Sequence, residues 1–183
     1  MTEPTPLYRW QSAEVRTDEA CRAADLASIL ADLQLVARWC ALHESAEFDD
    51  DVHAALWEAA VVAYGRSFTA GRDSKGRSGR RRRIDDTDLA VLTDVQRATH
   101  VAVRAERNRH IAHRDDRLGE INQVIRMSGE GDAAGVRAVG LTTWRRRGPT
   151  AYDVAALQAL AERLIEHLEP ILVAELDALN VTR

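Results

Sequence analysis

A short stretch of arginine, asparagine and histidine residues holds the side chains of this sequence that are best suited to chemistry. It reads RNRHIAHRD and runs from Arg107 to Asp115, at the end of a long helical pattern. A histidine exchanges a proton near neutral pH, and an arginine holds a fixed positive charge beside a phosphate. Cleavage of RNA at its 2′-hydroxyl needs both functions, so Arg107 and His113 form a candidate active site.

The same residue types also suit a structural role. Basic side chains in the last turn of a helix complement its negative end and bond its free carbonyl groups. The spacing of one arginine and one histidine is not specific either, since Arg104 and His110 repeat it. Residue chemistry alone therefore leaves a structural and a chemical interpretation open.

A metal site is a third interpretation of this stretch. Glu106, His110 and His113 match part of a ligand set, because a carboxylate precedes two histidines that are three residues apart. No cysteine accompanies them, and the three neighbouring arginines would repel a cation. We therefore expect no metal and no other cofactor.

The longer string resembles a known family. An arginine, a polar residue and then a histidine after four to six intervening positions is the motif of the HEPN superfamily, and RNRHIAHRD resembles its abortive-infection and toxin branch. The resemblance implies an antiparallel helical bundle that dimerises, so that two motifs face each other across a cleft and form a metal-independent endoribonuclease. On this basis His113 exchanges protons with the 2′-hydroxyl or the leaving oxygen, Arg107 stabilises charge on the phosphate, and Asn108 and His110 orient them.

The resemblance also implies partners for the chain. A second copy and RNA are expected, and a toxin would have an antitoxin. Some toxins of this superfamily carry a tyrosine two positions past the motif histidine, which a nucleotidyltransferase modifies to silence them. That position is Asp115 here. The sequence departs from the pattern, so it leaves open whether an antitoxin is of the nucleotidyltransferase type or another.

Composition and length predict one domain over residues 1–183. Apolar residues make up 45% of the chain, which is enough for an ordinary core. The apolar runs are too short to cross a membrane and the N-terminus does not resemble a signal peptide, so we expect a cytoplasmic protein. The net charge of −4 gives no overall attraction to nucleic acid, so RNA would be bound by local basic clusters.

The main basic cluster lies in a predicted loop over residues 71–84. Its sequence from Gly71 to Arg83 is GRDSKGRSGRRRR, in which glycine and serine disfavour regular structure. Closely spaced arginines bind a nucleic-acid backbone without reading its sequence, but the same composition also suits a soluble linker. The candidate RNA-binding residues are Arg80, Arg81, Arg82 and Arg83 here, with Arg109 and Arg114 in the motif.

Four helical patterns follow a loose leader over residues 1–16. The first helix is expected from Thr17 to about His43, and the second after Asp49, with an apolar stripe of large residues that belongs in the core. The third is expected to open at residues 85–88 and to lead into the motif, and the last to start at Thr150. The second stripe is Trp57, Val61, Tyr64 and Phe68, the third is Leu89, Leu92, Val95, Thr99, Ala102 and Val103, and the last is Leu157, Leu160, Leu164, Leu168, Ile171 and Leu172.

Two features of the second half are expected to interrupt the helices. Residues 119–147 contain two β-rich segments around a glycine-rich turn, which predicts a β-hairpin between the third and last long helices, although the first segment also fits a short helix. Trp144 suits packing of the hairpin on the bundle, or else stacking on RNA. Pro170 is expected to kink or restart the last helix, and His167 is expected at its surface. The fold class is therefore mainly α, a HEPN-like antiparallel helical bundle with one hairpin.

Overall fold

The computed structural model describes residues 17–45, 47–69, 82–108, 120–128, 136–145, 149 and 151–181. Within them the chain is mainly α-helical, as the sequence predicts. The helices are α1 (Asp18–Ser45), α2 (Asp50–Arg66), α3 (Asp94–Glu106) and α4 (Ala151–Val181), with a short 3-10 helix η1 (Asp88–Val91) and two strands, β1 (Glu120–Ser128) and β2 (Val136–Arg145). The leader and the second half of the motif, from Arg109 to Asp115, lie outside the described residues.

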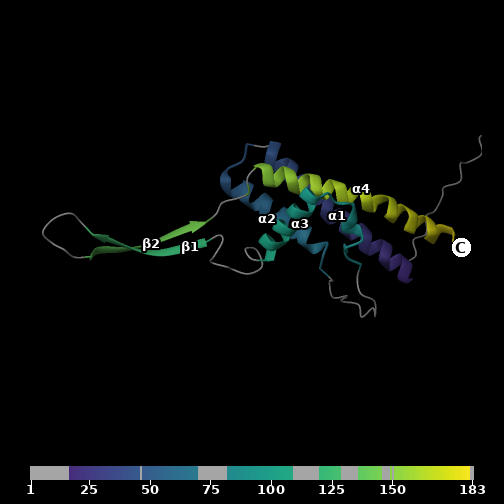
Figure 1. Ribbon diagram of the computed structural model, residues 1–183, viewed down its shortest axis with the longest axis horizontal. Coiled ribbons are helices and arrows are strands. Elements are labelled where there is room, and N and C mark those ends of the chain that lie inside the picture. The colour runs from purple at the N-terminus through teal and green to yellow at the C-terminus, as the bar shows by residue number, and fades with distance from the viewer. Residues whose placement is uncertain are drawn as a thin grey trace, which may run out of the picture.

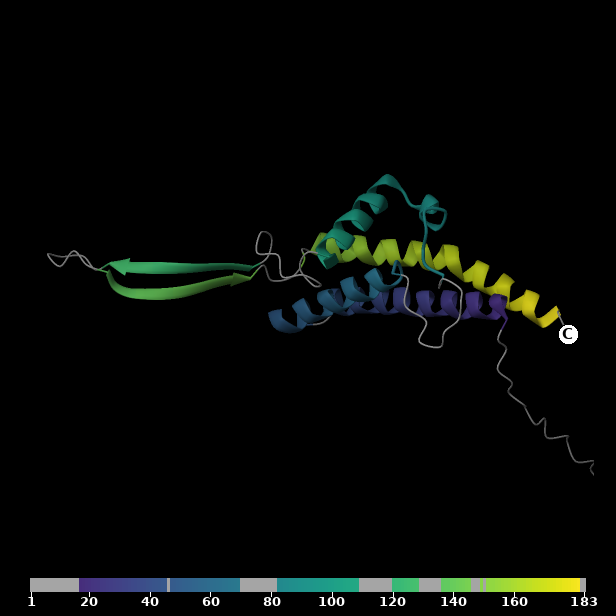
Figure 2. The same cartoon turned by 90° about the horizontal axis from the view of Figure 1, so that it is seen from below.

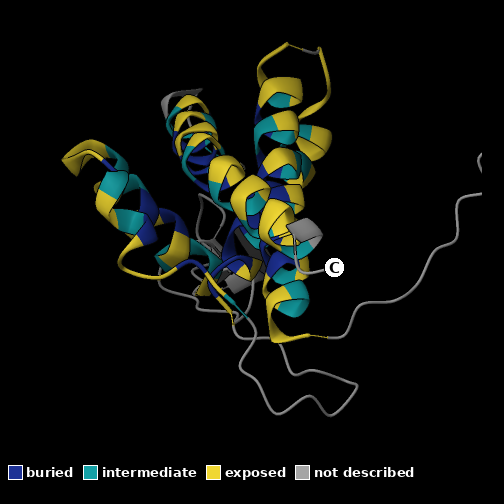
Figure 3. Cartoon of the chain, turned by 90° about the vertical axis from the view of Figure 1, so that its right-hand side faces the viewer, coloured by how far each residue is buried: buried dark blue, intermediate teal, exposed yellow. Residues whose placement is uncertain are grey.

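The helices α1, α2 and α4 lie side by side and form the body of the protein. α1 runs opposite to α2 and α4, and α3 crosses them at a steep angle (Figures 1 and 2). The buried residues face inward from each helix, while the outer faces are exposed (Figure 3). The predicted stripe of α4 lies in this core, since Leu157, Leu160, Leu164 and Leu168 are each fully buried. Burial of one such side chain contributes about 1.5–3 kcal/mol.

The first two helices begin where the sequence predicts. The backbone N–H of Ala20 donates to Thr17 Oγ1 over 3.2 Å. The N–H of Val52 donates to Asp49 Oδ1 over 2.8 Å. Each side chain satisfies a donor that has no partner inside the first turn of its helix.

The predicted start of the third helix is wrong. Residues 85–88 form a tight turn instead, because the Asp85 carboxylate accepts from the backbone N–H groups of Thr87 and Asp88 and so competes with helix formation. α3 starts at Asp94 after a capping box, in which Thr93 Oγ1 accepts from the N–H of Gln96 and the Gln96 side chain accepts from the N–H of Thr93.

The inner face predicted over residues 89–103 is confirmed only in part, since Leu92 and Val103 are buried and Leu89 packs against the core, whereas two other members are exposed. Val95 is 62% exposed and Ala102 is exposed. The buried residues of the helix are His100 and Val103. The side of α3 that faces the core is therefore more polar than the sequence pattern indicates.

α4 continues through Pro170 and does not restart there. Proline lacks the N–H that would donate to the carbonyl of Glu166, which weakens the helix locally. The last part of α4 is inclined to the rest of its axis (Figure 2). No helix in the described parts of the chain combines the length and the apolar character that a membrane span requires.

The backbones of β1 and β2 pair as an antiparallel ribbon within the range 119–147. Ile121 pairs with Trp144 and Val124 with Leu141, and a bulge interrupts the ladder beside Ser128. The ribbon extends beyond one end of the helices (Figures 1 and 2). The Trp144 side chain, for which packing on the bundle is predicted, lies outside what the structure describes.

Candidate active site

α3 is held on the aromatic stripe of α2. Tyr64, Trp57 and Phe68 are all buried, which confirms that this stripe belongs to the core. The hydroxyl of Tyr64 and Nδ1 of His100 are joined by a hydrogen bond of 2.8 Å. The His100 ring also lies edge-on to Phe68, with 4.8 Å between the ring centroids. One polar residue of α3 is thereby inserted among the aromatic rings of α2.

Burial keeps this pair uncharged. Loss of solvent lowers the pKa of His100 below its ordinary value, and the nearby Arg104 lowers it further. Burial likewise raises the pKa of the Tyr64 hydroxyl. Two neutral groups that share a hydrogen bond satisfy each other where water does not reach, so the bond fixes the middle of α3 at small electrostatic cost.

The last turn of α3 makes two further contacts with α2. The indole Nε1 of Trp57 donates to Glu106 Oε1 over 2.7 Å. The guanidinium carbon of Arg104 lies 5.2 Å from the centroid of the Phe68 ring, within cation–π range. The residues just before the motif are therefore fixed in position by side chains of α2.

The motif begins as α3 ends. Arg107 and Asn108 continue from Glu106 in a wider, π-type turn, a distortion often found at functional sites. Arg107 Nη1 donates to Asn108 Oδ1 over 3.0 Å. Arg107 is partly exposed and Asn108 is exposed. Of the predicted catalytic residues, these two are brought together; His110 and His113 lie outside the described residues, as do Arg109 and Arg114.

This arrangement leaves Arg107 able to bind an anion. A guanidinium group carries five N–H donors, and the bond to Asn108 uses one of them. The Asn108 oxygen orients the guanidinium group from one side, and among the described residues no second acceptor is bonded to it, so a phosphate could bind the other donors. Glu106, the carboxylate of the possible metal-ligand set, accepts a hydrogen bond from Trp57 at its Oε1 atom.

The arginines predicted to bind RNA in the loop are not equivalent. Arg82 lies between helices: Nη2 is 3.3 Å from Asp88 Oδ1, and Nη1 is 3.3 Å from Glu175 Oε1. Its backbone N–H donates to Asp25 Oδ2 over 3.0 Å. The guanidinium group of Arg82 therefore links α4 to η1. Arg83 is exposed, and Arg80 and Arg81 lie outside the described residues.

The end of the predicted loop is anchored next to this network. The N–H of Ile84 donates to the carbonyl of Ser67 over 3.0 Å, and the Ile84 side chain is buried. His167 is also partly buried here rather than free at the surface, with Nε2 3.7 Å from Asp88 Oδ1. Sequence periodicity places His167 between two glutamates, but it gives no sign that Asp88 lies beside it.

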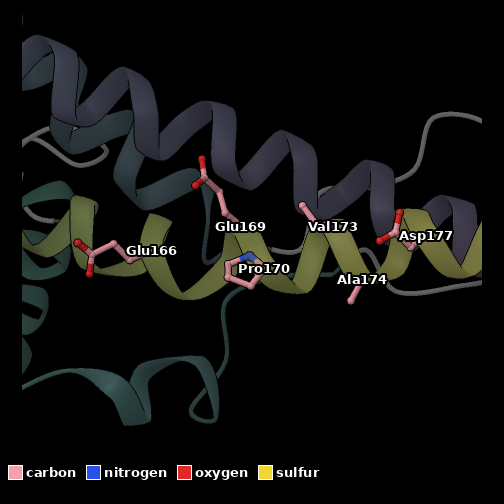
Figure 4. Close-up of a pocket in the computed structure, with 6 residues that line it drawn as sticks. All are labelled: Glu166, Glu169, Pro170, Val173, Ala174 and Asp177. Carbon is pink, nitrogen blue, oxygen red and sulfur yellow. The ribbon is translucent and has the colours of Figure 1, made fainter.

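Other parts of the described chain offer little for chemistry. No three histidine, cysteine, aspartate or glutamate residues gather closely enough there to hold a metal ion. The end of α3 lies toward the N-terminal half of α4 (Figure 2). A shallow hollow lies away from it, on the C-terminal half of α4 (Figure 4). Its lining residues are Glu166, Glu169, Pro170, Val173, Ala174 and Asp177.

Comparison with protein-family models, curated proteins and solved structures gives no match to this chain.

Acid should destabilise the protein through His100. The pKa of His100 in the folded state lies below the ordinary value of 6.5. As the pH falls, the unfolded chain therefore binds a proton at this histidine more readily than the folded chain does. The stability that depends on neutral His100 is complete above that ordinary value and is lost as the pH falls below it. Melting temperatures measured between about pH 7.5 and about pH 5 should fall with pH, and His100→Gln should reduce the slope. An unchanged slope in His100→Gln would contradict this.

The arginines at the end of the loop should separate into two groups. Arg82→Gln should lower the free energy of unfolding by about 2 kcal/mol, because it leaves the buried Asp88 carboxylate without its cation. Substitution of Arg80, Arg81 and Arg83 by glutamine should leave the melting temperature unchanged and weaken RNA binding, with a smaller dependence on salt. If RNA affinity and its salt dependence stay the same in that triple variant, the segment is only a linker.

Proposed function

We propose that this protein is a metal-independent endoribonuclease of the HEPN type that acts as a toxin or phage-defence effector. The observation that carries the proposal is the placement of Arg107 and Asn108 at the end of α3. The first two motif residues contact each other there, and within the described part of the chain the guanidinium group bonds only to Asn108. The mainly α-helical bundle is compatible with the fold that the motif implies.

In the proposed reaction the RNA supplies its own nucleophile. His113 accepts the proton of the 2′-hydroxyl, the 2′-oxygen attacks the adjacent phosphorus, and the bond to the 5′-oxygen breaks. A proton returned by a histidine completes the leaving hydroxyl. Arg107 stabilises the charge that gathers on the phosphate oxygens, while Asn108 and His110 orient the reacting groups. The products are a cyclic phosphate and a free 5′-hydroxyl, and DNA is excluded because it lacks the 2′-hydroxyl.

The proposal includes a homodimer that pairs through α3. One arginine and one motif histidine per chain make a sparse site, and two-fold pairing doubles it. Val95 is 62% exposed and Val101 is 65% exposed on α3, and a second copy packed along this helix would cover exposed apolar surface. An antitoxin, of nucleotidyltransferase or other type, would be a further partner.

The second candidate function is a non-catalytic interaction protein, in which the same arginines and histidines hold a dimer or another protein. Exposed apolar side chains favour it. Besides the valines of α3, α4 exposes Val173 and Leu176 to 57% and 46%. Exposed apolar groups on two helices suit protein contacts as well as they suit a nuclease dimer.

RNA cleavage in the presence of EDTA tests the first proposal. His113→Ala and Arg107→Ala should each remove most cleavage, by about 100-fold or more, since each removes a group used in the transition state. Thermal unfolding should change little. His43→Ala and Arg38→Ala serve as matched controls on α1 and should cleave normally. Cleavage that persists in both motif variants, or a motif variant that chiefly unfolds, would favour the interaction protein.

The dimer is tested separately by light scattering at micromolar concentration. Val101→Asp should convert the dimer into a monomer that stays folded, because the substituted side chain is exposed within one chain and would be covered only by the second copy. Val173→Asp, at a similarly exposed site on α4, is the control and should remain a dimer. A monomeric unmodified protein would contradict the prediction.

A further inference from the structure

Gly65 lies in the last turn of α2 and is buried against the side chain of Arg107. A methyl group built at Gly65 would lie 3.1 Å from Cγ of Arg107, and 3.2 Å from both its Cδ and its Nε. All three nearest atoms belong to that one side chain, and none is a backbone atom. The space that a larger residue would fill is therefore occupied by the stem of Arg107.

The backbone gives no reason for a glycine at this position. Gly65 is helical and does not have the positive φ that favours glycine, and at a helical position glycine is about 0.5–1 kcal/mol less favourable than alanine. Alanine would therefore be expected on local grounds. The contact with Arg107 supplies the missing reason, because it is the closest approach that an added methyl group would disturb.

The neighbours of Arg107 are fixed as well. Glu106 is bonded to Trp57, and Arg104 lies over the ring of Phe68, so the last turn of α3 cannot move aside easily. The stem of Arg107 lies against Gly65, and its end is bonded to Asn108. Contacts on two sides therefore define where the guanidinium group lies.

We propose that Gly65 is a positioning residue for Arg107: its missing side chain forms a slot that sets the guanidinium group at the place where the phosphate is held. This inference rests on the proposed ribonuclease function. An added methyl group moves the stem by a few tenths of an ångström, and the displacement grows toward the guanidinium end. A misplacement of about 1 Å at a reacting group can cost about 100-fold in rate.

The first test compares Gly65→Ala with the unmodified full-length protein. We expect kcat for RNA cleavage to fall about tenfold or more with KM nearly unchanged, because the change affects alignment rather than overall binding. The melting temperature should stay the same or rise. In the Arg107→Ala background, Gly65→Ala should have no further effect on the residual rate. An unchanged kcat in the single variant, or an equal loss of rate in both backgrounds, would overturn the inference.

The second test does not require activity. In protein labelled with ¹⁵N-arginine, the Nε–H resonance of Arg107 is assigned by its loss in Arg107→Lys. Gly65→Ala should shift this resonance more than that of any other arginine. An unshifted resonance overturns the inference even if the protein cleaves RNA. A shifted resonance in a protein that cuts no RNA contradicts the ribonuclease proposal, but it supports the role of Gly65 in positioning the Arg107 side chain.

Discussion

Burial of the leucine stripe of α4 against α1 is the interaction on which the rest of the structure depends. Leu157, Leu160, Leu164 and Leu168 are fully buried, and they face the long apolar stripe of α1 that includes Leu26 and Leu33. These contacts are apolar and extend over many turns, so their contribution is large and not tied to any single pair. α2 and α3 are placed on this frame, and the position of the motif follows from where they lie.

α3 depends on a different kind of interaction. It contributes only two buried residues, and its position on α2 is set by specific polar contacts: the bond from Tyr64 to His100 and the bond from Trp57 to Glu106. Apolar burial is non-directional and would tolerate a small rotation of the helix, whereas hydrogen bonds between buried groups do not. The polar face of α3 therefore contributes less to the stability of the core than an apolar face would. It does, however, fix the orientation of the C-terminal end of α3, where Arg107 lies.

The sequence predicts well what depends on local periodicity and capping. The starts of α1 and α2, the core stripe of α4 and the mainly α-helical class all follow from residues close together in the chain. What it misses depends on tertiary contacts. Asp85 and Asp88 resemble a helix start, but Asp88 is bound by Arg82, and their turn precedes the helix, which begins at Asp94. The roles of His100 and Gly65 arise only when α3 meets α2, and no spacing within either helix reveals them.

The hydrogen bond between Ser67 and Ile84 brings together two residues that lie on either side of the basic segment over residues 71–83, and close to Ile84 the Arg82 side chain is paired with Asp88. The entropy of closing such a loop grows only with the logarithm of its length, so a doubling costs about 0.6 kcal/mol. Residues can thus be added to or removed from the segment over evolutionary time at little expense to the folded bundle.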